Sequence, residues 1–109
     1  MNKPLIERKT PRYQMQVRIF FTAGELEGEG VVQNLSKGGC CVQSDTGAPD
    51  GAELNAWIYF PDYEWPLKVE QAVVRWHKED QFGLQFVELQ PAQRERLRTV
   101  LAGKKFQVG

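Results

Sequence analysis

Apolar and polar residues alternate along much of this 109-residue chain, in short runs separated by turn-forming residues. The alternation is clearest at residues 13–21, where every second side chain is apolar. A period of two residues is typical of a β-strand with one buried face. Five further strands are predicted on the same grounds, at residues 28–35, 40–43, 54–60, 65–76 and 82–89.

The hydrophobic period changes after the last predicted strand. Pro91 opens a segment whose apolar residues fall on one side of a helix, and Gly103 follows that segment. Proline in the first turn and glycine beyond the last are typical helix boundaries, so we predict a helix of about three turns. Its apolar positions are Leu97, Val100 and Leu101. The arginines at positions 94, 96 and 98 are expected on a solvated face.

Six short strands followed by one helix predict an all-β domain with a terminal helix. The expected architecture is a six-stranded antiparallel barrel or rolled sheet, because closure protects strand edges from unwanted pairing. The helix is expected to cover one opening of the barrel. A chain of this length forms a single domain. We therefore assign residues 1–12 to a flexible basic arm, 13–102 to the barrel and its helix, and 103–109 to a tail.

Composition and charge narrow the classes of function. Apolar residues make up 41% and charged residues 26%, as in ordinary globular proteins. The 14 basic and 14 acidic residues cancel, whereas a general binder of nucleic-acid polymers carries a basic excess. An anion site in this chain must therefore be local. Without a signal peptide or a long apolar run, we expect a soluble cytoplasmic protein with no membrane association.

The residues that most often carry chemistry are few. Cys40 and Cys41 are neighbours, and since adjacent strand residues face opposite ways, one thiol is expected to be buried and the other exposed or at an edge. His77 is the single histidine, too little for a metal site with these cysteines. No catalytic motif is found, so we expect neither an enzyme nor a metal or organic cofactor.

The segment 34–39, Asn-Leu-Ser-Lys-Gly-Gly, separates two apolar runs. Asn and Ser side chains bond to nearby backbone and favour turns. Glycines permit positive φ and let another group approach the main chain closely. A plain hairpin turn explains the segment when it is considered alone. A basic cluster upstream suggests that the segment also contributes to a binding site.

That cluster lies in the arm, where residues 1–12 carry four basic side chains and one acidic one. Pro11 biases Thr10 toward extended backbone, so Arg8 and Arg12 do not share one face of a helical turn. The planar guanidinium matches both phosphate and the guanine base edge. Two such side chains on an extended arm could hold an anion against the barrel. The alternative is a solvated basic tail.

The two clusters together resemble the motifs of the PilZ domain family. Residues 8–12 (Arg-Lys-Thr-Pro-Arg) match its first motif, and Asn34, Ser36 and Gly39 match its second. Residues 73–76 and 82–86, followed by a helix, are also similar to the family. The resemblance covers residues 7–101 and implies a six-stranded antiparallel barrel with a C-terminal helix. It also implies binding of cyclic di-GMP, a bacterial second messenger.

The resemblance assigns roles to particular residues. Arg8 and Arg12 would contact a guanine edge and the phosphates, while Asn34 and Ser36 would hold the other guanine or its sugar-phosphate. Gly39 would keep the turn open for the ligand. Lys9 and Gly38 are secondary candidates. The family often has Asp at the position of Asn34, and an amide has only one accepting oxygen, so the affinity is expected to be lower.

The implied mechanism is a switch in which the ligand orders the arm and the new surface signals through an unidentified effector protein. Glu7, an acidic residue before Arg8, favours one ligand per chain. The family's outputs are motility, adhesion or biofilm, and polysaccharide production. Two alternatives remain: a nucleotide-free adapter of the same fold, and a small barrel that binds single-stranded nucleic acid. The tryptophans could stack on bases, or serve in the core.

Overall fold

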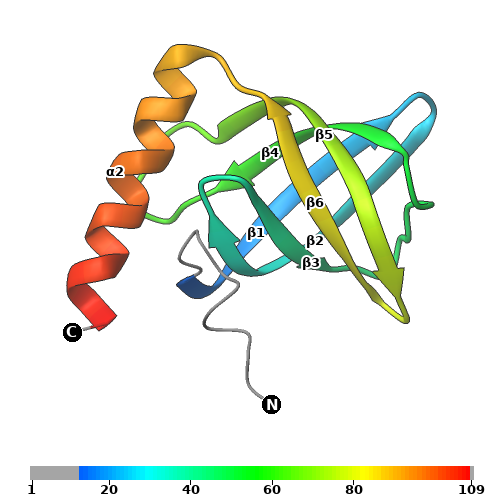
Figure 1. Cartoon of the computed structure of the whole chain (residues 1–109), viewed down its shortest axis with the longest axis horizontal. Helices are drawn as coiled ribbons and strands as arrows, with labels where there is room; N and C mark the ends of the chain where they lie inside the picture. Colours follow the sequence, from blue (N-terminus) through cyan, green and yellow to red (C-terminus); the bar gives the residue numbers. More distant parts are fainter. Residues whose placement is uncertain (1–12, 109) are drawn as a thin grey trace.

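The computed structural model describes the backbone of residues 13–108 and the side chains of residues 15–103. Six strands are followed by one helix, as the sequence predicts (Figure 1). The elements are β1 (Tyr13–Ala23), β2 (Leu26–Ser36), β3 (Gly39–Gln43), β4 (Glu53–Tyr59), β5 (Leu67–Lys78), β6 (Gln81–Glu88) and α2 (Pro91–Val108).

The strands form a closed barrel in the order β1-β2-β3-β6-β5-β4. Every pairing is antiparallel, and the β3–β6 and β1–β4 pairs join segments that are distant in sequence. The closed six-stranded barrel confirms the predicted fold. Closure leaves the described sheet with no open edge, so all six strands contribute to one curved wall.

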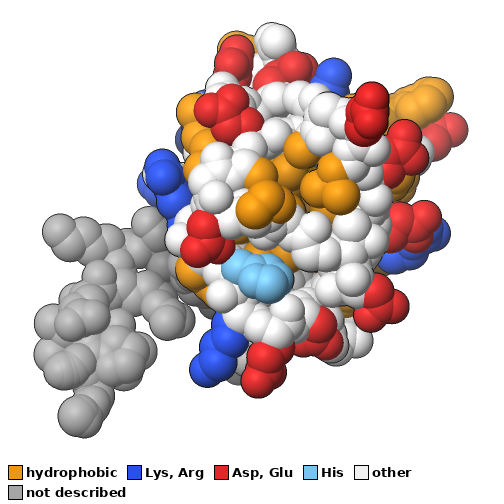
Figure 2. Space-filling model, turned by 90° about the vertical axis from the view of Figure 1, so that its right-hand side faces the viewer, with side chains coloured by type: hydrophobic (Ala, Val, Ile, Leu, Met, Phe, Trp, Pro, Cys, Tyr) orange, Lys and Arg blue, Asp and Glu red, His pale blue; other side chains and the backbone are white. Residues whose placement is uncertain are grey.

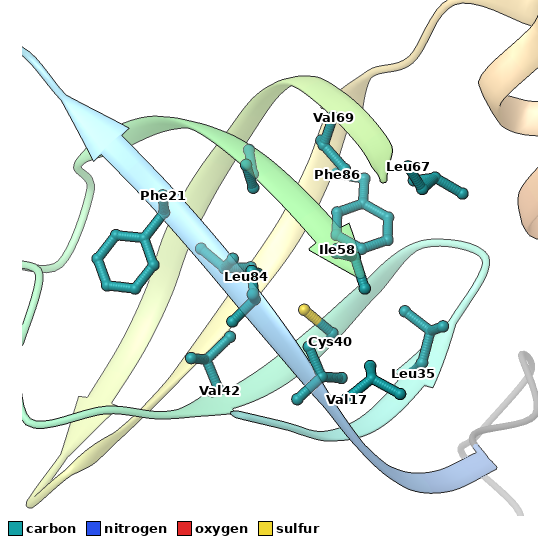
Figure 3. Packing of buried hydrophobic residues seen from close by; sticks show 14 of the residues in the cluster. Val17, Phe21, Leu35, Cys40, Val42, Ile58, Leu67, Val69, Leu84 and Phe86 are labelled. Carbon is teal, nitrogen blue, oxygen red and sulfur yellow. The ribbon is translucent and has the colours of Figure 1, made fainter. Parts of the chain in front are cut away.

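The barrel interior is filled by the apolar side chains that alternate along the strands. Phe21 and Phe82 are fully buried and meet edge to face, with ring centroids 5.4 Å apart. Figure 3 shows Val17, Leu35 and other apolar side chains of the same cluster, which come from several strands and point into the barrel. Burial of this continuous apolar cluster is the main force that holds the barrel together.

The helix α2 packs against β5 and β1 and lies at one end of the barrel (Figure 1). It begins at Pro91, where the Arg94 amide donates to the Gln90 carbonyl over 2.9 Å. The predicted end at Gly103 is wrong, because the helix continues to Val108. Gly103 keeps helical backbone without a positive φ, and the lysines that follow favour helix. Residues 103–108 therefore belong to the helix and do not form a separate tail.

Arg96 does not belong to a purely solvated face, which corrects a second expectation. Its guanidinium donates to the carbonyl of Pro66 over 3.0 Å and also to that of Trp65. It lies 5.1 Å from the ring centre of Tyr63. These contacts fasten residues 60–66, the loop between β4 and β5, to the helix.

Both cysteines are buried, so the expected exposed or edge thiol is not found. Cys40 is 2% exposed and lies among the core residues (Figure 3). Cys41 is only 7% exposed although it belongs to the outer side of the wall. Gln81 covers part of it, with the Cys41 Sγ 4.0 Å from Oε1 of that glutamine. A position that alternation assigns to the surface is thus covered by the neighbouring strand β6.

Candidate functional site

The strand register brings the start of β1 beside the first half of the 34–39 segment. Tyr13 pairs with Leu35, and Gln14 pairs with Asn34. Arg12 is covalently next to Tyr13, but it lies outside the described residues, as do Arg8 and Lys9. The register therefore places the point where the arm joins β1, at Tyr13, next to the start of the 34–39 segment.

A β-bulge changes which side chains face outward at this place. The pairing of β2 with β3 shifts between Val32 and Asn34, so Gln33 is an extra residue in β2. Val32 and Leu35 both lie in the core. Gln33 and Asn34 between them therefore both belong to the outer surface, although strict alternation would have separated them.

A hollow of about 490 Å³ lies on the outer wall at the bulge. Its lining comes from β1, β2, β3 and β6, and consists of Met15, Gln16, Gln33, Asn34, Cys41 and Gln81. Of these lining side chains, all from the part of the chain that the structure describes, four are neutral amides and none is charged. The hollow thus offers hydrogen-bond donors and acceptors together with two polarisable sulfur groups, and it contributes no formal charge of its own.

Asn34 is the one residue that the sequence motif and the lining of the hollow share. The sequence did not mark Gln16, Gln33 or Gln81 as site residues, and it noted Cys41 only as one of two adjacent cysteines. Their only signal is an outward polar position in a strand, which is common on any surface. Their convergence depends on the bulge and on the β3–β6 pairing, and neither has a local sequence signal.

Ser36 closes the turn between β2 and β3. Its hydroxyl is buried, accepts from the Gly38 amide over 3.3 Å and donates to the Gly39 carbonyl over 3.3 Å. A hydroxyl has two accepting lone pairs, so one remains for a further donor. The serine therefore has a structural role in shaping the turn, in addition to the contact expected from the sequence.

The two glycines of the turn have different surroundings. A Cβ on Gly39 would lie 2.1 Å from the backbone oxygen of Leu84 in β6, while one on Gly38 would meet nothing within 4 Å. Neither glycine has positive φ. The Gly38 carbonyl accepts from the Phe86 amide over 2.9 Å. Close approach by β6, instead of an unusual backbone angle, is what requires glycine at position 39.

One row of paired residues crosses the outer wall from the hollow to β5. Asn34 pairs with Cys41, Cys41 with Gly83, and Gly83 with Trp76. The Trp76 indole lies over Gly83, because a Cβ at that glycine would be 2.1 Å from its Nε1 atom. Trp76 is 43% exposed. The large, partly exposed Trp76 ring extends from β5 over β6, and β6 is two strands from Asn34 in β2 on the outer wall.

The opposite end of the barrel has a different charge. Figure 2 shows the side of the molecule that faces away from α2. Acidic side chains lie around the edge of this face, and basic side chains are fewer. Exposed acidic residues cluster in the turns at this end, namely Glu25, Glu27, Asp45, Asp50, Glu79 and Asp80. An anionic ligand is therefore disfavoured at these turns.

Two general properties of residues 13–108 bear on the class of protein. No three side chains of the metal-ligating types gather there in a way that could hold an ion. No helical segment in this part of the chain combines the length and the apolar character needed to cross a membrane. The fold and the hollow together define a small barrel domain with a neutral, amide-rich recess on its wall.

Comparison with known proteins identifies the family. The family model for the PilZ domain matches residues 6–103, so this chain belongs to the PilZ domain family. No curated protein matches the sequence.

Three solved structures share the fold. The inhibitor of motility MotI/DgrA of Bacillus subtilis is 21% identical with a TM-score of 0.76, covering 93% of this chain and 52% of that one. The PilZ domain of YcgR from Escherichia coli, with c-di-GMP, is 11% identical with a TM-score of 0.75 and 94% coverage of both chains. The PilZ domain of CeSA from a cellulose-synthesizing bacterium is 13% identical with a TM-score of 0.69, covering 87% and 98%. The present chain thus spans about half the length of MotI/DgrA.

Proposed function

We propose that this domain is a receptor for cyclic di-GMP. The observation that carries the proposal is the register of β1 on β2, in which Gln14 pairs with Asn34. It joins the arginine-bearing arm to the wall beside the 34–39 motif and the hollow. A nucleotide ligand needs both a charged clamp and a polar recess, and the chain offers them next to each other.

The uncharged lining of the hollow supports separate roles for the two parts, with the wall contacting a base and the arm contacting the phosphates. Cyclic di-GMP has two guanines and two phosphates, and the hollow offers amides for a base but no cation for a phosphate. The arm has to supply the positive charge. An extended residue spans at most about 3.6 Å, so the backbone of Arg8 stays within roughly 18 Å of Tyr13 and that of Arg12 within roughly 4 Å.

In this proposal Arg8 and Arg12 contact a guanine edge and the phosphates, and Asn34 and Ser36 hold the second guanine or its sugar-phosphate. Gly39 contributes indirectly, by letting the turn pack on β6. The volume of about 490 Å³ is in the range of small-molecule sites. The YcgR domain with c-di-GMP has the same fold, which supports the ligand class.

The proposed action is a switch, without chemical conversion of the ligand. Ligand contacts that exist only when the arm lies against the wall shift the equilibrium toward that state. The resulting surface recruits or releases an effector protein in the cytoplasm. The fold shared with the inhibitor of motility MotI/DgrA favours motility as an output. One ligand per chain is expected, since Glu7 precedes the first arginine.

Isothermal titration calorimetry with cyclic di-GMP tests the proposal. The parent is expected to bind one ligand, and Arg12→Ala to bind at least about tenfold more weakly, or roughly 1.4 kcal/mol. Arg98→Ala is the matched control, because Arg98 is exposed on α2 and its side chain pairs with Glu95 on the same helix. Absence of binding by the parent contradicts the proposal and favours the nucleotide-free adapter. Salt-sensitive binding of an oligonucleotide instead favours the nucleic-acid alternative.

A further inference from the structure

Three polar side chains form a hydrogen-bonded chain beside the hollow, which we call the amide relay. Gln43 Nε2 donates to Asp80 Oδ2 over 3.1 Å, and Gln33 Nε2 donates to Gln43 Oε1 over 3.0 Å. The relay thus joins the turn between β5 and β6 to β3 and then to β2. It ends at Gln33, which lines the hollow.

The direction of the relay follows from the chemistry of Asp80. An ionised carboxylate only accepts hydrogen bonds, so Gln43 must turn its NH₂ group toward Asp80. The oxygen of Gln43 then faces Gln33, which must donate in its turn. The acceptor at Asp80 thus fixes the orientation of both amide groups. The Gln33 carbonyl oxygen is the accepting atom that the relay does not use.

Asp80 is well placed to set this direction because its backbone is held. The Ser44 amide donates to the Asp80 carbonyl over 2.9 Å, which ties the turn to the end of β3. The preceding residue, Glu79, has φ of 57° and so shapes a tight two-residue connection. The carboxylate therefore starts the relay from a defined position.

We propose that Gln33 is a guanine-selecting residue of the hollow, an inference that rests on the proposed function. Guanine presents two adjacent donors, N1–H and the exocyclic NH₂, and one Asn offers a single accepting oxygen. The bulge in β2 sets Gln33 on the same face as Asn34, and the relay leaves its oxygen as the second acceptor. The amide oxygens of Asn34 and Gln33 then accept the two guanine hydrogen bonds that the two oxygens of a single carboxylate would otherwise accept. Adenine has an acceptor at N1 and gains nothing from this arrangement.

Calorimetry with cyclic di-GMP and cyclic di-AMP on Gln33→Leu tests the acceptor. The variant removes the amide and keeps a branched apolar side chain, one atom shorter than Gln, at this half-buried position. We expect about fivefold weaker binding of cyclic di-GMP and unchanged binding of cyclic di-AMP. Adding Asn34→Asp supplies two acceptors from one residue, so it is expected to improve cyclic di-GMP affinity more in the Gln33→Leu background than in the parent.

Inverting the relay gives a second test. Asp80→Lys replaces an acceptor by a donor, so Gln43 must turn its oxygen toward position 80 and Gln33 must turn its own oxygen toward Gln43. Cyclic di-GMP binding is expected to weaken about threefold, although the change adds positive charge near an anionic ligand. Glu79→Lys is the matched control, with the same charge change in the same turn but outside the relay, and it should not weaken binding.

The outcomes separate the two proposals. If the parent binds no cyclic di-GMP, the proposed function fails and this inference with it. If the parent binds but Gln33→Leu has no effect, or weakens both dinucleotides equally, only the role of Gln33 is overturned. Equal effects of Asp80→Lys and Glu79→Lys overturn the relay. The melting temperature of each variant is measured as well. A value within about 3 °C of the parent shows that weaker binding is not caused by loss of folding.

Discussion

The two ends of the barrel use glycine for different purposes. At the hairpin end, formed by the β1–β2 turn, residues 44–52 and the β5–β6 turn, lie the residues of positive φ within the described chain: Gly24, Gly51 and Glu79. At the motif end, formed by the start of β1, the β2–β3 turn and residues 60–66, Gly38 and Gly39 have ordinary backbone. Gly24 and Gly51 supply a backbone angle at the first end, whereas Gly39 supplies a missing side chain at the second.

The ends also differ in charge, since exposed acidic side chains gather at the hairpin end (Figure 2). The motif end adjoins Lys37 in the β2–β3 turn and leads into the basic arm. The comparison shows that a chain with zero net charge can still distribute its charges unevenly, with a cluster of acidic residues in the turns of one end. It also teaches that a glycine within a ligand motif can be required by packing alone.

Gly39→Ala is expected to have the largest effect on stability. Its Cβ would lie 2.1 Å from the Leu84 oxygen, a backbone atom that cannot move without disturbing the β3–β6 pairing. We expect a loss of about 3 kcal/mol in the free energy of unfolding, at the upper end for overpacked sites. Urea denaturation measures it.

Gly38→Ala is the matched control for that substitution, because the added methyl group meets open space. Its expected change is within about 0.5 kcal/mol, the usual range for surface substitutions. Similar losses for both variants contradict the steric explanation of Gly39.

Gly24→Ala tests the other half of the comparison. Gly24 has φ of 62° and open space around its Cβ position, so the cost comes only from the backbone angle. We expect a loss of roughly 1 kcal/mol. Gly24→Asn should cost less, since Asn adopts the left-handed conformation more readily. Equal losses for Ala and Asn in thermal melts argue against a backbone origin.

Most of the fold was predictable from the sequence, for local reasons. The alternation at 13–21 and 54–60 and the turn residues between strands have a short-range signal, and the structure confirms the strands there. The helix end was not predictable from Gly103, because a glycine can continue a helix when helix-forming residues follow it. The contacts of Arg96 depend on a loop thirty residues away in sequence, to which the helical period gives no guide.

The site was predictable only in part. The motif around Asn34 and Ser36 stands out in the sequence, and the roles that it implies for the arm remain predictions. Gln33 and Gln81 did not stand out, because the bulge breaks the alternation and the β3–β6 pairing joins distant segments. The burial of Cys41 has the same cause. Local patterns thus predict strands well, but not which outer positions a closed barrel brings together.

The smallest expected effect concerns charge at the two ends and is measured as affinity for cyclic di-GMP at low salt. Lys37→Glu alters an exposed residue of the β2–β3 turn and is expected to weaken binding about threefold, an effect that salt near 1 M should remove. Glu25→Lys makes the opposite change at the hairpin end, beyond a Debye length of about 10 Å, and is expected to leave affinity nearly unchanged. If Glu25→Lys strengthens binding as much as Lys37→Glu weakens it, overall charge governs binding. The sorting of charge along the barrel would then have no part in selecting the ligand.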